Sequence, residues 1–135
     1  MTTDGTATIT FWLDDHGVMH VVARPDATQS LDDARGNVRA VAAALRGRQC
    51  PLLIDMREVK YFAREVREYY TSEEAMASAS AFAVLVGSSL TRTLANMMLS
   101  ATRTQVPTKL FTDQAKAEAW LRPFGAGKKR EVASR

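Results

Sequence analysis

Several side chains that could bind an anion follow two apolar segments, 52–56 and 81–86. If these segments are neighbouring parallel strands, their carboxyl ends meet at the edge where open α/β sheets bind ligands. A helix that begins after Ser89 would add free N–H groups for an anion. Two simpler roles compete: Ser88 or Ser89 as a helix N-cap, which we favour, and Asp55 as an acceptor that fixes its loop. The candidate ligand-binding residues are Asp55, Arg57, Ser88, Ser89 and Arg92.

Metal and nucleophile chemistry have weaker support. His16 lies beside Asp14 and Asp15 in a predicted turn, but zinc usually takes four ligands from two elements, and Asp also favours turns for its local hydrogen bonds. His20 is expected on the exposed face of a strand. Neither histidine can be placed near Cys50, so we predict a structural role for this cysteine. We therefore expect no metal site, no cofactor and no catalytic residue.

A second candidate site is the stretch from Tyr61 to Tyr70, where charges of both signs lie among aromatic residues. Arg64 and Glu68 are spaced i,i+4 on a predicted helix and can pair on its surface. Because Tyr and Arg are enriched at protein interfaces, the stretch also suits a protein-binding face. The candidate partner-binding residues are Tyr61, Phe62, Arg64, Arg67 and Tyr70.

The elements that must position these residues follow from hydrophobic periodicity. Residues 7–13 alternate apolar and polar side chains, and residues 18–23 form a second strand after a turn that ends in Gly17. These two strands are expected to pair antiparallel. Apolar residues at intervals of three and four predict a helix over 31–47, with Ser30 as its N-cap.

The rest of the chain alternates strands with helices. The expected strands are 52–56, 81–86 and 107–112, and the expected helices are 63–78, 90–101 and 114–121. The helix 63–78 is expected to be irregular near Thr71 and Ser72, and Asp113 caps the last helix. For Met97 and Met98 we favour burial of both, with an adaptable apolar surface such as a dimer contact as the alternative.

This order predicts an α/β fold, because strands that alternate with helices need crossovers and a mostly parallel sheet. We expect one domain over residues 1–124, with about five strands that include an N-terminal hairpin, and about four helices. Residues 125–135 contain two glycines and four basic residues, and are expected to be a disordered basic tail.

Composition excludes several function classes. The 135 residues are 46% hydrophobic and 24% charged, and no apolar run approaches the roughly 20 residues of a membrane span. The net charge is +3, but the last eleven residues hold four basic and one acidic residue, so the remainder is neutral. The basic character belongs to the tail, which argues against a nucleic-acid-binding face. The single cysteine and the lack of a signal-peptide pattern lead us to expect a cytoplasmic protein.

Three strings resemble the SpoIIAA-like family, which includes the STAS domains of anti-sigma-factor antagonists. Residues 52–62 show an apolar strand, an Asp, then a Val and an aromatic residue before the next helix. Residues 107–121, with Phe-Thr-Asp at the strand end and Trp-Leu in the helix, are similar to a bacterial SpoIIAA-like group of unassigned function. The third string is 92–96, and the resemblance covers about residues 8–122. It implies this fold, with a partner surface on the loop and helix at 61–70.

The chain departs from the family at the phosphorylation site. Antagonist STAS domains carry an Asp-Ser pair at the start of the second helix, and a kinase anti-sigma factor phosphorylates the serine. Matching on Asp55, Val59 and Tyr61 puts Ala63 and Arg64 there, and Arg64 cannot accept a phosphate. We therefore expect a non-catalytic regulatory or scaffolding module that binds a protein partner without this switch, with self-association as a homodimer left open. The alternative is a small-molecule or anion binder that uses the carboxyl edge of the sheet.

Overall fold

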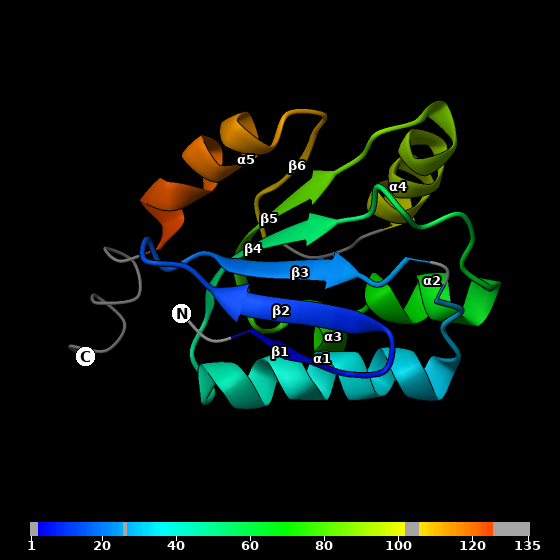
Figure 1. Ribbon diagram of the computed structural model, residues 1–135, viewed down its shortest axis with the longest axis horizontal. Helices are drawn as coiled ribbons and strands as arrows, with labels where there is room; N and C mark the ends of the chain where they lie inside the picture. Colours follow the sequence, from blue (N-terminus) through cyan, green and yellow to red (C-terminus); the bar gives the residue numbers. More distant parts are fainter. Residues whose placement is uncertain (1–2, 26, 102–105, 126–135) are drawn as a thin grey trace.

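A six-stranded mixed sheet forms the centre of the protein, seen in Figure 1 as a computed structural model that describes residues 3–25, 27–101 and 106–125. The strands are β1 (Asp4–Gly5), β2 (Ile9–Leu13), β3 (Met19–Ala23), β4 (Cys50–Asp55), β5 (Ala79–Leu85) and β6 (Thr108–Phe111). The helices are α1 (Leu31–Leu45), α2 (Arg64–Tyr70), α3 (Glu73–Met76), α4 (Ser89–Ala101) and α5 (Gln114–Leu121), and a 3-10 turn, η1 (Arg122–Phe124), follows α5. The predicted α/β class is confirmed.

The strands lie in the sheet in the order in which they occur in the sequence. The first three strands pair antiparallel, and β3 to β6 are parallel. The predicted hairpin of β2 and β3 is present, with Gly17 at φ 83°. The Asp14 carboxylate fixes this turn, because its Oδ1 accepts the backbone N–H of His16 at 2.8 Å and that of Val18 at 3.0 Å.

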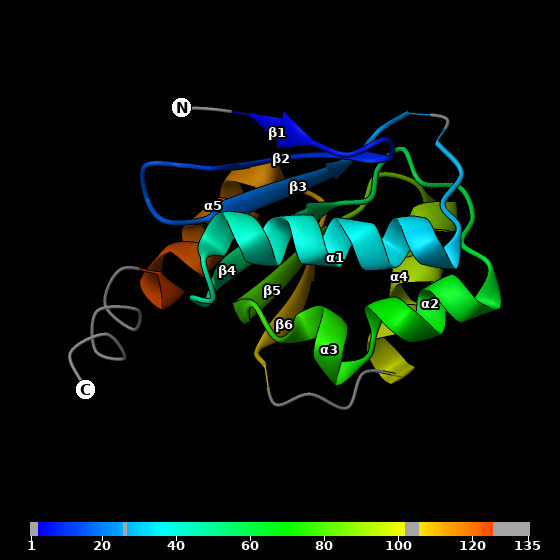
Figure 2. The same cartoon turned by 90° about the horizontal axis from the view of Figure 1, so that it is seen from below.

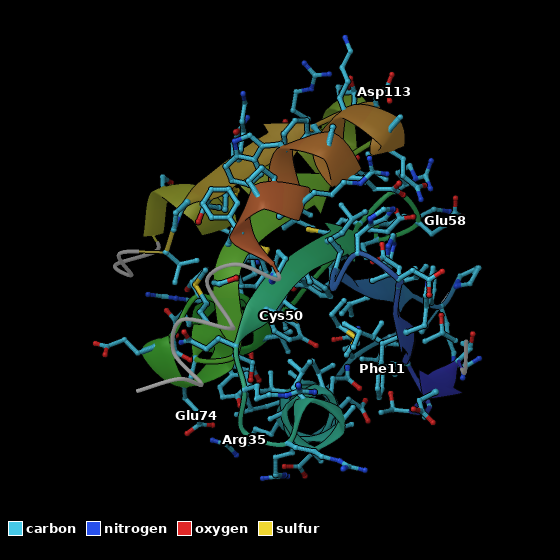
Figure 3. All side chains as sticks on the ribbon, turned by 90° about the vertical axis from the view of Figure 1, so that its left-hand side faces the viewer. Phe11, Arg35, Cys50, Glu58, Glu74 and Asp113 are labelled. Atoms are coloured by element: carbon cyan, nitrogen blue, oxygen red, sulfur yellow. The ribbon has the colours of Figure 1, made fainter. Side chains whose placement is uncertain are left out.

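Helices cover both faces of the sheet. The first four helices pack on one face, where α1, α2 and α4 share a core cluster with Val84 of β5 (Figure 2). On the other face, α5 packs against β4, β5 and β6, with Ala83 and Leu85 in its cluster. Figure 3 shows this layering: Arg35 of α1 and Glu74 of α3 lie on one side of Cys50 in β4, and Asp113 at the start of α5 lies on the other.

Local signals fix the helix ends. Ser30 and Asp33 form a reciprocal capping box at the start of α1, with N–H to oxygen distances of 2.9 and 3.0 Å. After Leu45 the chain turns through two left-handed residues, Arg46 (φ 54°) and Gly47 (φ 78°). Asp113 caps α5, as predicted, by accepting the N–H of Lys116.

The structure corrects several details. The short strand β1 at the sheet edge was not predicted. The expected helix 63–78 is two helices, because Ser72 caps a new helix by accepting the N–H of Ala75. His20 is 6% exposed rather than on an exposed face, since it stacks on Trp12.

At the end of the chain, Gly125 was assigned to the tail but is buried. The other tail residues, 126–135, lie outside the described part of the chain. Cys50 is buried in the core. Such a position is compatible with the structural role that we predicted for it. Within the described ranges, no helix has both the length and the apolar character needed to cross a bilayer.

Candidate functional site

The carboxyl edge of the sheet brings together the residues predicted to bind an anion, but it uses their polar groups internally. Asp55 and Arg57 form a two-point ion pair, with Arg57 Nε 3.0 Å from Oδ1 and an Arg57 terminal nitrogen 2.7 Å from Oδ2. The Asp55 carboxylate also accepts the backbone N–H of Arg57, so Asp55 fixes its own loop. This ion pair raises the pKa of Arg57.

The start of α4 is closed in a similar way. Ser88 caps the helix by accepting the N–H of Thr91 at 3.2 Å, which is the role we favoured for it. In return, the Thr91 hydroxyl oxygen accepts the N–H groups of Gly87 and Ser88, each at 3.1 Å. The N–H groups that could hold an anion are therefore partly taken, while Ser89 and Arg92 lie exposed. Thr91 was missed, because a Thr three residues after a cap is a weaker signal than Glu or Gln.

The predicted partner-binding residues divide between surface and interior. Tyr61 is 71% exposed, but Phe62 is buried in a core cluster. Arg64 lies exposed and donates to Glu68 at 3.1 Å. Arg67 is half-buried and donates to the carbonyl oxygen of Phe62 at 2.7 Å, so it braces the loop that carries Tyr61. Tyr70 points inward.

The inward position of Tyr70 results from a polar network that the sequence did not reveal. Asn37 of α1 donates to the Tyr70 hydroxyl at 3.1 Å and to the Thr8 hydroxyl at 2.9 Å. Tyr70 in turn donates to Gln29 Oε1. Burial raises the pKa of Tyr70, so its hydroxyl keeps its proton at neutral pH. Asn37 lies three residues after Ala34 and four before Val41, which places it on the buried stripe of α1.

Exposed apolar side chains extend the surface around α2 onto α4. Leu90 is 55% exposed and Met97 is 49% exposed, and their spacing of seven residues puts them on one side of α4. A groove of about 120 Å³ joins Met97 to Arg64 and Arg67. The prediction that Met97 is buried is thus wrong, while Met98 is half-buried. We call this surface the α2–α4 face; its residues are Tyr61, Arg64, Arg67, Leu90 and Met97.

The position that we matched to the phosphorylated serine of antagonist STAS domains lies at the beginning of α2. Ala63 is the N-cap residue, and no side chain caps this helix end. Arg64, the first helical residue, pairs with Glu68 one turn later. A basic residue at this end is unfavourable to the helix dipole, and Glu68 offsets its charge.

The N-terminal hairpin holds the two histidines apart from both candidate sites. His20 Nε2 lies 2.9 Å from Asp14 Oδ2, and the His20 ring stacks on Trp12 with 4.9 Å between centroids. Burial alone would raise the pKa of Asp14, but the hydrogen bonds from His20, Val18 and His16 outweigh it and lower the pKa. No group of three or more metal-ligating side chains occurs among the described residues.

One family model and one solved structure are similar to the chain, and the descriptions of both give the function as unknown. The family described as Domain of unknown function (DUF7793) matches residues 11–125. A crystal structure of a protein with unknown function from Arthrobacter sp. FB24 is 27% identical; the match covers 82% of this chain and 90% of that chain, with a TM-score of 0.31. No curated protein matches the chain.

Proposed function

The chain belongs to the DUF7793 family, and we propose that it is a non-catalytic regulatory or scaffolding module that binds a protein partner through the α2–α4 face. The exposed apolar residues of this face carry the proposal. In the described part of the chain, the large hydrophobic side chains that are exposed are Tyr61, Leu90 and Met97. All three lie on segments that follow the neighbouring parallel strands β4 and β5, and exposed apolar surface is typical of an interaction site.

The composition of the face also supports a protein partner. Two guanidinium groups and two methionines lie around one groove, the loop before α2 exposes Tyr61, and Tyr, Met and Arg are residues enriched at protein interfaces. The resemblance to STAS-like domains adds support, since their partner surface includes the corresponding loop and helix. Because Arg64 replaces the phosphorylated serine, binding here would be constitutive with respect to that switch.

The other functions considered have less support. A catalytic site would need an acid and a base with altered pKa values in a shared cleft, whereas the Asp14–His20 pair serves the hairpin. An anion site at the carboxyl edge would compete with the hydrogen bonds that Asp55 and Thr91 already accept. If the partner is a second copy of this chain, the α2–α4 face forms a homodimer contact.

A photo-crosslinking experiment tests the proposal. A photoreactive phenylalanine analogue at position 61 should form a defined crosslinked species in the native cell. The triple variant Y61S/L90S/M97S, used as a competitor in excess, should fail to prevent that crosslink, whereas the wild-type chain should prevent it. Sedimentation of the pure protein separates a homodimer from a complex with another protein.

A matched control lies on the opposite face of the sheet. Lys116→Glu changes an exposed residue of α5, so this variant should compete as well as the wild-type chain. If the triple variant folds normally and competes as well as Lys116→Glu, the α2–α4 face is not the binding surface and the proposal fails.

A further inference from the structure

A cavity of about 130 Å³ lies between the sheet and helices α1 to α4. We call it the apolar chamber, because apolar side chains from both layers form most of its wall. Among its lining residues are Val41, Leu52, Ile54, Met76, Phe82 and Val84. Native interiors are packed as densely as organic crystals and hold few voids larger than a water molecule. The chamber is instead partly open to solvent, so a small molecule can reach it from outside.

The chamber has a polar end. Gln29, Asn37 and Tyr70 line it, and the hydrogen bonds between them hold their side chains in place. Gln29 is only 8% exposed, and its Oε1 accepts from Tyr70. Its Nε2 donates to no group in the described part of the chain. The network thus holds the Gln29 amide in place, and its N–H groups remain available to a ligand at the wall of the chamber.

The charges around the chamber favour a neutral occupant. Asp55 is the one acidic residue among its lining residues, and Arg57 neutralises it through the two-point ion pair. Because its pKa is raised, Tyr70 is also uncharged at neutral pH. An ionised ligand would lose its hydration without gaining an unpaired opposite charge, which is strongly unfavourable.

We propose that the apolar chamber binds a neutral, mainly apolar small molecule of about the size of a substituted benzene ring. The volume is close to that of an engineered cavity of about 150 Å³ that binds benzene, so it suits one ring, and a small substituent extends towards the open side of the chamber. One carbonyl or hydroxyl oxygen of the ligand accepts a hydrogen bond from Gln29 Nε2, and the ring packs against the apolar wall. A mainly apolar pocket with a few fixed polar groups is the usual design of small-molecule sites.

Methionine methyl groups provide the test. Met56 and Met76 line the chamber alone, Met98 lines both the chamber and the groove of the α2–α4 face, and Met97 lines that groove alone. The full chain, labelled with ¹³C at the methionine methyl groups, is titrated with benzene, acetophenone and benzoate. We expect benzene and acetophenone to shift the Met56 and Met76 methyl signals to saturation and to leave the Met97 signal in place. Benzoate, which is charged, should cause no saturable shift.

Two variants separate the polar end from the apolar wall. Gln29→Met removes the amide donor, so acetophenone should bind about threefold to tenfold more weakly, the effect of one hydrogen bond, while benzene binding stays unchanged. Ala75→Phe places a ring at a half-exposed position of the wall and should abolish saturable binding of both probes. The methyl shifts of the wild-type chain locate the probes even if Ala75→Phe does not fold.

Three results would overturn the inference. They are an absence of saturable shifts up to the solubility limit of benzene, shifts at Met97 as large as those at the chamber methyl groups, or equal binding of benzoate and acetophenone. The test is independent of the proposed partner, because the triple variant Y61S/L90S/M97S retains the chamber and should bind acetophenone normally.

Discussion

The two faces of the sheet are covered in different ways, although the same strands supply both. On the α5 side, Ala81 and Ala83 of β5 meet Ala117 and Leu121 of α5, and all four are completely buried. On the opposite side, four helices cover larger strand residues such as Phe82 but leave the apolar chamber between the layers.

The difference shows how helix continuity and side-chain size govern packing. Alanines on both α5 and β5 are fully buried and let these elements approach closely. On the other face, the break at Thr71 and Ser72 replaces one helix by two short ones. The α5 face therefore stabilises the fold, and the chamber face retains room for a ligand.

Two adjacent leucines of β4 give the most direct test of this comparison. Leu53 points towards α5, and Leu52 lines the chamber. Leu53→Ala should lower the free energy of unfolding by about 3–5 kcal/mol, because it opens a cavity in a filled interface. Leu52→Ala should cost about 2–3 kcal/mol, because this side chain already lacks contacts on one side. Urea unfolding of both variants measures the difference, and an equal or larger cost for Leu52→Ala would contradict it.

Enlarging an alanine should have opposite consequences on the two faces. Ala117→Leu inserts a side chain into the closed α5 interface, and overpacking should destabilise the protein by about 1–3 kcal/mol. Ala75→Leu projects into the chamber wall and should change stability by less than about 0.5 kcal/mol. Thermal unfolding under the same conditions compares the two. A large loss for Ala75→Leu would show that the chamber face is as tightly packed as the other.

The Asp14–His20–Trp12 group covers the α5 side of the sheet at β2 and β3, beyond the strands that α5 contacts. Asp14→Ala should cost about 1–2 kcal/mol at pH 7, because it removes three hydrogen bonds. The pKa of Asp14 is lowered in the folded state, so its contribution is complete above the ordinary value of 3.8 and is lost as the pH falls through the folded pKa.

Urea unfolding between pH 7 and pH 2.5 measures this acid dependence. The stabilities of the wild-type chain and Asp14→Ala should converge at the acid end. If the gap between them stays constant across the range, the carboxylate charge contributes nothing.

Local patterns were sufficient for most of the fold. The apolar run of β5, the alternation in β2 and the capping signals at Ser30 and Asp113 are all short-range features, and each predicted its element. The strand β1 escaped prediction because two residues show no periodicity. Irregularity near Thr71 and Ser72 was expected, but the new helix that Ser72 caps was not.

The candidate site was harder to predict, because its residues are defined by their tertiary surroundings. An apolar stripe on α4 looks the same whether a neighbouring helix covers it or not, so Met97 was assigned to the core. Tyr70 was assigned to the surface because the sequence does not show that α1 presents Asn37 to it. Asn37 itself could have been found by asking which polar residue lies on a buried helical stripe. The chamber depends on gaps between layers, for which the sequence has no local signal.

The sequential strand order has a consequence for how the chain folds. Each strand pairs with its predecessor, but the parallel pairings close crossovers over 24–49, 56–78 and 86–107, and pairing over such separations slows folding. The end of the chain adds one long closure. Ser80 donates to the carbonyl oxygen of Phe124 at 3.1 Å, and a Cβ at Gly125 would lie 3.0 Å from the His16 carbonyl oxygen. The turn at residues 122–125 thereby contacts both β5 and the turn of the β2–β3 hairpin, and its docking closes the longest loop among these contacts.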